Sequence, residues 1–267
     1  MISFFLKKNF CDGWDNLFFI VASNLFPIIV VAAGFFGIRY AANKPFVIQA
    51  LSIILFTGIL MMVVFAFGAN AAKIANFDTP SFGAFFRCFS YSWKVGLLFG
   101  IMISTGLLIA KLGILYYLNM FGASQNIIWF LPAALLCWFV IVCAIAFQWF
   151  IPLYFLQETN NFSKCFKKSF IIFFDNPLFS IGMFIHNVLL FTLSLCFVLL
   201  LPGFSGITIS SMNALRLRLY KYDWIEEHPE IANSRLKRSK VPWDELLADD
   251  KESLGPRKIS SFLFPWR

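Results

Sequence analysis

The sequence predicts an all-α membrane protein, a polytopic bundle of about six transmembrane helices arranged as three hairpin repeats. Three observations predict this fold class: hydrophobic residues make up 60% of the 267 residues, charged residues only 13%, and the mean hydropathy is +0.76. A soluble chain carries about 25% charged residues. Because so few charges do not cover a water-facing surface, we expect most of the molecular surface to face lipid.

Apolar stretches long enough to cross a bilayer divide the chain into spans. A hydrocarbon core about 30 Å thick needs about 20 apolar residues in a helix. The last expected span is shorter than the others and rich in small residues, which suit close helix packing. The expected spans are 16–38, 46–69, 95–118, 127–155, 178–201 and 203–219. We therefore expect a transmembrane domain over 1–221 and a charged, aromatic tail over 222–267.

Basic residues in the loops predict the orientation of these spans. Lys and Arg favour the cytoplasmic side of a membrane, and the loops 70–94 and 156–177 both carry several of them. If 203–219 crosses the membrane, the basic tail lies on that same side, whereas an odd number of crossings leaves it outside. We therefore expect cytoplasmic N- and C-termini. The first span is longer than the core of a signal peptide, so we expect it to be retained.

A short motif recurs before the odd-numbered spans. Residues 7–19 (KKNFCDGWDNLFF) and 167–179 (KKSFIIFFDNPLF) share Lys-Lys, Phe and Asp-Asn, and 87–93 repeats the pattern more weakly. Each copy predicts a short amphipathic helix on the inner leaflet, with its basic side on lipid headgroups. The alternative is that any membrane protein places Lys and aromatic residues at this interface. The expected interface residues are Lys7, Lys8, Arg87, Lys167, Lys168, Trp14 and Trp93.

Several segments carry a resemblance to known families. NLFFIVASNLFPII, FGANAAK with SFGAFFRCFSYSWKVGLL, and LPGFSGITISSMNALRLRLY resemble segments of the YesL-like family of uncharacterised bacterial integral membrane proteins. FSKCFKKSFIIFFDNPLFSIG is similar to segments of YciC-like six-span proteins. The resemblance covers most of 10–222; the full helix at 46–69 and the tail depart from it. It implies a multi-pass protein of the bacterial inner membrane, in a family assumed to accompany sugar ABC transporters.

Polar residues inside the spans are the candidate site. Ionisable groups within a span mark function by default, and His186 lies about eight residues into its span, near the midplane. We expect a polar cavity around His186, Asn187, Asn24, Gln148 and Ser104. Two interpretations remain open: a ligand or proton site, or hydrogen bonds that hold helices together at about 0.6 kcal/mol each.

The sequence contains no pattern typical of a catalytic or metal site. G-x-S-x-G, Walker A, H-E-x-x-H and dinucleotide-binding glycine motifs are missing, and no expected span has Asp or Glu in its interior. The six cysteines form no C-x-x-C motif and no cluster with His. We therefore expect no enzymatic activity, metal or cofactor. The dispersed basic residues also argue against nucleic-acid binding, and leave membrane lipids as the expected partners.

The tail carries the aromatic residues Trp243, Phe262, Phe264 and Trp266, which we expect to dock on the protein itself, on lipid, or on a partner. Disordered segments rarely hold so many aromatic residues. Two functions follow: a non-enzymatic accessory or scaffold subunit associated with a transport complex, or a small transporter or lipid- or solute-binding protein that uses a polar cavity around His186. Whether the polar side chains face a cavity or a packed helix seam separates the two. The sequence does not indicate the substrate or the oligomeric state.

Overall fold

The computed structural model describes residues 1–158, 160–228 and 241–257, which form helices and no strands. Five helical stretches are long and apolar enough to cross a membrane: Leu17–Ala41, Phe46–Ala75, Phe82–Ser124, Ile127–Leu156 and Pro177–Cys196. The predicted all-α membrane bundle is therefore confirmed.

Three helical hairpins make up the bundle, and shorter helices lie between and beside them. The first hairpin is α2 (Leu17–Ala41) with α3 (Phe46–Ala75). The second is α4 (Phe82–Ser124) with α5 (Phe130–Phe147), and the third is α8 (Pro177–Cys196) with α9 (Gly203–Glu227). The shorter helices are α1 (Ile2–Asp15), η1 (Ile127–Trp129), α6 (Phe150–Leu156), α7 (Phe162–Asp175), α11 (Trp243–Leu246) and α12 (Ala248–Leu254).

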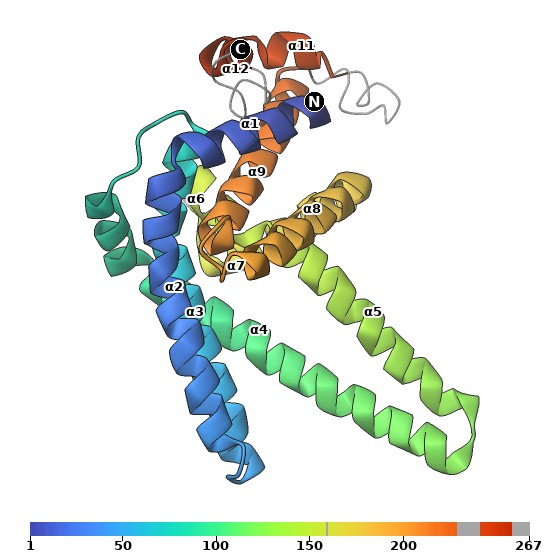
Figure 1. The fold of residues 1–267 in the computed structure, drawn as a ribbon. Coiled ribbons are helices and arrows are strands. Elements are labelled where there is room, and N and C mark those ends of the chain that lie inside the picture. Colours follow the sequence, from blue (N-terminus) through green and yellow to red (C-terminus); the bar gives the residue numbers. More distant parts are fainter. Residues whose placement is uncertain (159, 229–240, 258–267) are drawn as a thin grey trace.

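The first and last helices lie together at one end of the bundle, which we name the terminal face. Figure 1 shows α1, α11 and α12 at this end, while the α4–α5 hairpin slants away from α2–α3. Lys7 Nζ donates a hydrogen bond to the carbonyl of Gly255 at 3.0 Å, and Arg257 pairs with Asp15 at 2.6 Å. The described part of the tail therefore folds back onto the N-terminal helix.

The α8–α9 hairpin reaches only part of the way along the first hairpin. Its turn is held by Asn24, which donates to the carbonyls of Leu200 and Pro202 at 2.9 Å each and accepts from the backbone N–H of Ser205 at 2.9 Å. Asn24 is the eighth residue of α2, so it lies about 10 Å from the start of a helix about 37 Å long. The turn of the hairpin therefore lies in the half of the bundle nearer the terminal face.

Both ends of this hairpin lie on the same side of the bundle. Arg218 and Lys221, near the end of α9, donate to Asn176 Oδ1 just before α8, at 3.2 and 2.8 Å. Arg216 donates to the carbonyl of Ala75, the last residue of α3. The predicted sixth span at 203–219 lies within α9, which is not among the five long apolar stretches and returns to the end from which α8 starts, so the sixth crossing stays a prediction. The predicted fifth span, 178–201, is longer than α8, which ends at Cys196.

Two of the three predicted interfacial helices are separate helices. α1 and α7 each contain 14 residues, and Asn161 caps α7 by accepting a hydrogen bond from the backbone N–H of Lys164 at 2.9 Å. The middle copy, 87–93, instead belongs to the 43-residue helix α4, whose first turn is capped by Ser81. The helix continues because the residues between the cap and the expected span at 95–118 include no proline.

Glycines bring α3 and α4 into close contact. A Cβ atom at Gly100 would lie 2.6 Å from the carbonyl oxygen of Thr57, and one at Gly96 would lie 2.9 Å from the Cα of Met62. Small residues allow such backbone approach in membrane helices. Next to this contact, the rings of Phe65, Phe99 and Phe150 pack in the main core.

Candidate functional site

An apolar cavity of about 690 Å³ lies between the α4–α5 hairpin and the α8–α9 hairpin, with walls also from α3, α6 and α7. Its volume falls in the range of roughly 300–1,000 Å³ typical of small-molecule sites. Apolar side chains such as Met102, Ile103, Phe147 and Phe204 form most of the lining, and none of the described residues that line it carries a charge. The cavity can therefore hold an uncharged, mainly hydrocarbon ligand.

The rim of the cavity lies on the apolar surface of the bundle. Leu107, Ile109 and Phe139 line the cavity and are 51%, 65% and 62% exposed. All three belong to helical stretches that are long and apolar enough to cross a membrane. The opening therefore faces the hydrocarbon that surrounds these helices.

One end of the cavity is polar, and we name it the amide end: Gln148, Asn187, Thr208 and Ser211. Asn187 Nδ2 donates to Gln148 Oε1 at 3.3 Å and to Ser211 Oγ at 3.1 Å. Gln148 Nε2 donates to the carbonyls of Ile145 and Ser180 at 2.9 and 2.8 Å. These bonds connect α5, α8 and α9 across the end of the cavity.

A break between α5 and α6 places Gln148 at this end. Pro152 has no N–H for the carbonyl of Gln148, four residues earlier, so the helix is interrupted there. Trp149 Nε1 donates to Ser180 Oγ at 3.2 Å, which fixes the break against α8. The bend and this indole bond together turn the Gln148 side chain toward Asn187.

Asn187 retains one unsatisfied group. Its side chain is 9% exposed, and its Oδ1 accepts no hydrogen bond from the described residues. A buried acceptor without a partner costs about 1–3 kcal/mol. A ligand that donates a hydrogen bond at this position would recover that free energy.

The five residues of the predicted polar cavity do not come together. Gln148 and Asn187 line the cavity, but His186 Nε2 lies 3.1 Å from Asn9 Nδ2, and its ring packs edge-on against Phe5 in α1. Successive residues of a helix point about 100° apart, so neighbours on α8 face different partners.

The other two predicted residues, Asn24 and Ser104, make their hydrogen bonds away from the cavity. Asn24 holds the α8–α9 turn, and Ser104 Oγ donates to the carbonyl of Gly100 on its own helix at 2.7 Å. Neither side chain lines the cavity. Thr208 and Ser211 do line it and were missed as site residues; the small-residue composition of 203–219 is the only sequence signal for them.

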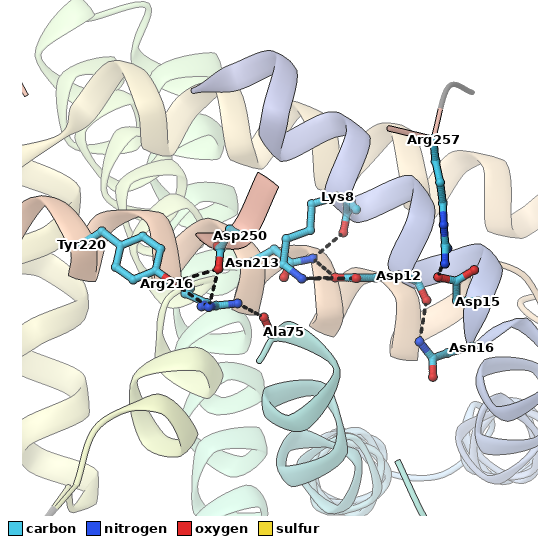
Figure 2. Close-up of polar contacts among 11 residues, drawn as sticks. Lys8, Asp12, Asp15, Asn16, Ala75, Asn213, Arg216, Tyr220, Asp250 and Arg257 are labelled. Carbon is cyan, nitrogen blue, oxygen red and sulfur yellow. Dashed lines mark hydrogen bonds and ion pairs between the residues drawn. The ribbon is translucent and has the colours of Figure 1, made fainter. Parts of the chain in front are cut away.

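A buried ionic network lies beneath the terminal face (Figure 2). Lys8 Nζ pairs with Asp12 at 3.0 Å, and Asp12 accepts from Asn213 Nδ2 at 2.7 Å. Arg216 pairs with Asp250 of the tail at 2.8 Å. Burial raises the pKa of Asp12 and lowers the pKa of Lys8, because desolvation disfavours the charged form of each, while the charge of each partner opposes the shift.

This network changes the role expected of Lys8. Lys8 is 3% exposed, and its ammonium lies 3.6 Å from the centre of the Phe77 ring, so it lies inside the protein rather than on lipid headgroups. Lys7 bonds to Gly255, and Lys168 donates to Gln157 Oε1 at 2.7 Å. The remaining expected interface residues are at least partly exposed: Arg87, Lys167, Trp14 and Trp93.

The described part of the tail packs on its own chain. Trp243 is partly buried against the main core, with the Arg218 guanidinium 5.7 Å from its ring centre, and Leu247 and Leu254 are buried. Phe262, Phe264 and Trp266, predicted to dock with Trp243, lie outside the described residues.

No protein-family model, curated protein or solved structure matches the chain. Within residues 1–158, 160–228 and 241–257, no three His, Cys, Asp or Glu side chains cluster in a way that could hold a metal ion.

Proposed function

We propose that this membrane protein binds a lipid-like amphiphile, with the hydrocarbon chain in the cavity and the polar group at the amide end. The observation that carries the proposal is a cavity of about 690 Å³ with uncharged walls, whose rim lies on the apolar surface of membrane-crossing helices. This is the second of the two functions expected from the sequence. Its centre moves from His186 to Gln148, Asn187 and Ser211.

The apolar walls of the cavity determine what can fill it. Side chains that line an empty cavity lack the dispersion contacts that packed side chains make, and apolar cavities do not hold water well. A hydrocarbon chain restores these contacts, and the bilayer supplies such chains at high concentration. Membrane lipids are therefore the ligand pool available to a cavity that opens on the hydrocarbon side.

Two further expectations belong to this proposal. The basic loops 70–94 and 156–177 support a cytoplasmic terminal face, and the resemblance to YesL-like proteins supports the bacterial inner membrane. On this orientation the α8–α9 hairpin enters from the cytoplasmic side, and the amide end lies in the inner half of the bilayer.

A matched pair of glycines provides the test. Gly106 lines the cavity and Gly182 does not; both are exposed helical residues, and a Cβ atom at either meets nothing within 4 Å. Gly106→Trp should place an indole in the cavity and remove the lipid that remains bound through detergent purification. Gly182→Trp should leave it. Native mass spectrometry measures bound lipid, and equal retention by both variants would contradict the proposal.

A second candidate is an accessory or scaffold subunit associated with a transport complex. It is favoured by the start of α4, where Phe86, Tyr91 and Trp93 are 59%, 58% and 38% exposed. Exposed aromatic side chains suit a protein partner in the membrane interface. Replacing Phe86 and Tyr91 with Ser should remove partners from a cross-linked pull-down; an unchanged set of partners would contradict this candidate.

A further inference from the structure

We infer that the amide end selects an uncharged lipid whose polar group donates a hydrogen bond, the class of long-chain alcohols, over anionic and ether-capped lipids. This inference rests on the proposed function and names the chemistry of its ligand. It follows from three observations on the amide end: the orientation of its two amides, the bonds already made by the N–H groups of these amides, and the lack of charge in the lining.

The orientation of both amides is fixed by carbonyl groups. The carbonyls of Ile145 and Ser180 can only accept hydrogen bonds, so the Gln148 atom that faces them must be Nε2. Gln148 therefore presents Oε1 to Asn187, and the Asn187 atom that faces it must be Nδ2. The unpartnered atom of Asn187 is consequently its oxygen, an acceptor.

The amide donors at this end are already used. Both N–H groups of Gln148 and both of Asn187 have acceptors in the protein, and Thr208 Oγ1 donates to the carbonyl of Phe204 at 2.8 Å. Asn187 Oδ1 remains as an acceptor without a donor. The oxygen is covered by neighbouring atoms, so a ligand contacts it only when the Asn187 amide turns toward the cavity and shifts its bonds to Gln148 and Ser211.

The lining excludes charged headgroups. All described side chains that line the cavity are uncharged, so none offers an ion pair to a carboxylate, phosphate or ammonium group. An ion brought into such an environment without a partner pays a large desolvation cost. The desolvation cost of a hydroxyl is much smaller, and a hydrogen bond donated to Asn187 Oδ1 offsets it.

Three ligands with the same hydrocarbon chain test the inference on the unmodified protein. The purified full-length chain is photolabelled with a diazirine-bearing C18 alcohol, and oleyl alcohol, oleyl methyl ether and oleate compete for the label. Oleyl alcohol should compete about tenfold better than the ether, which cannot donate a hydrogen bond, and better than oleate at neutral pH. Equal competition by the alcohol and the ether, or stronger competition by oleate, would overturn the inference.

A variant locates the effect. Asn187→Leu should bring the alcohol and the ether to within about twofold of each other, whereas Ser104→Ala removes a buried hydroxyl outside the cavity and should keep the difference. A tenfold preference that persists in Asn187→Leu would overturn the assignment to Asn187. The proposed function itself fails if none of the three ligands competes and Gly106→Trp is labelled as strongly as the unmodified chain. If all three ligands reduce the labelling equally, only the headgroup selection is refuted.

Discussion

Replacing Asn24 with Ala should release the turn of the α8–α9 hairpin. The side chain is fully buried and makes three hydrogen bonds to the turn backbone, at 2.9 Å each. Each lost bond costs about 1 kcal/mol net, so the free energy of unfolding should fall by about 3 kcal/mol. For a chain of this size, about 3 kcal/mol corresponds to a decrease in Tm of roughly 6–12 °C.

Thermal unfolding in detergent, followed by size-exclusion fluorescence, measures this change. Ser104→Ala is the matched control, because Ser104 is 3% exposed but bonds only to carbonyls of its own helix. Such bonds within a helix contribute little, so its Tm should change by less than about 3 °C. The hairpin also carries Asn187 and Ser211, so Asn24→Ala should weaken photolabelling of the cavity. Equal Tm values for the two variants would refute the role given to Asn24.

Further variants test the turn of the α8–α9 hairpin, the buried ionic network and the burial of Cys165 in α7. Gly203→Ala should lower the Tm by at least 5 °C: its φ is +62°, a left-handed conformation, and a Cβ there would lie 2.2 Å from the nearest side-chain nitrogen of α2. Lys8→Met should cost about 3–5 kcal/mol because it leaves Asp12 buried without its partner, and Lys8→Met combined with Asp12→Leu should recover most of that loss in the same unfolding assay. Burial raises the pKa of Asp12, so at pH values between the ordinary and the raised pKa the folded protein binds more protons than the unfolded chain. The free energy of unfolding should therefore fall as the pH rises through that window. Asp12→Asn should remove this pH dependence when unfolding is measured over a pH series. Burial raises the pKa of the Cys165 thiol to about 11, so maleimide should label it much more slowly at pH 7.5 than a cysteine introduced at the exposed Ser163, and comparable labelling rates would contradict its burial.

The sequence predicts the positions of helices well where a long run of apolar residues is enough to define a helix. The long apolar stretches at 46–69 and 127–155 lie within helical segments close to their expected bounds, because a run of apolar residues in a bilayer must satisfy its backbone internally. The exception is α9. Its residues 203–219 are mostly small and polar, and they are buried against α3, α8 and α1 rather than by lipid. Hydropathy cannot separate such a helix from a weak span.

The site was less predictable, because it depends on which face of each helix meets a neighbour. His186 and Asn187 are adjacent in the sequence, yet one faces α1 and the other faces the cavity. The cavity lies where α4 and α5 diverge from their shared turn toward α7, α8 and α9 (Figure 1). No residue pattern in a single sequence encodes that divergence. The unpartnered acceptor of Asn187 depends on the hydrogen bonds that Gln148 makes in the folded chain, which the sequence does not specify.

The positions that a photoactivatable lipid labels test the central claim most directly. Val64 and Phe99 line the cavity but are only 6% and 3% exposed, so a chain that stays on the outer surface does not reach them. Leu189 on α8 is 63% exposed outside the cavity and reports bulk lipid. After irradiation of the protein in vesicles with a diazirine-bearing acyl lipid, we expect adducts by peptide mass spectrometry at Val64 and Phe99 as well as at Leu189, with the first two lost in Gly106→Trp. Adducts confined to outward-facing residues such as Leu189 would contradict a lipid-binding cavity.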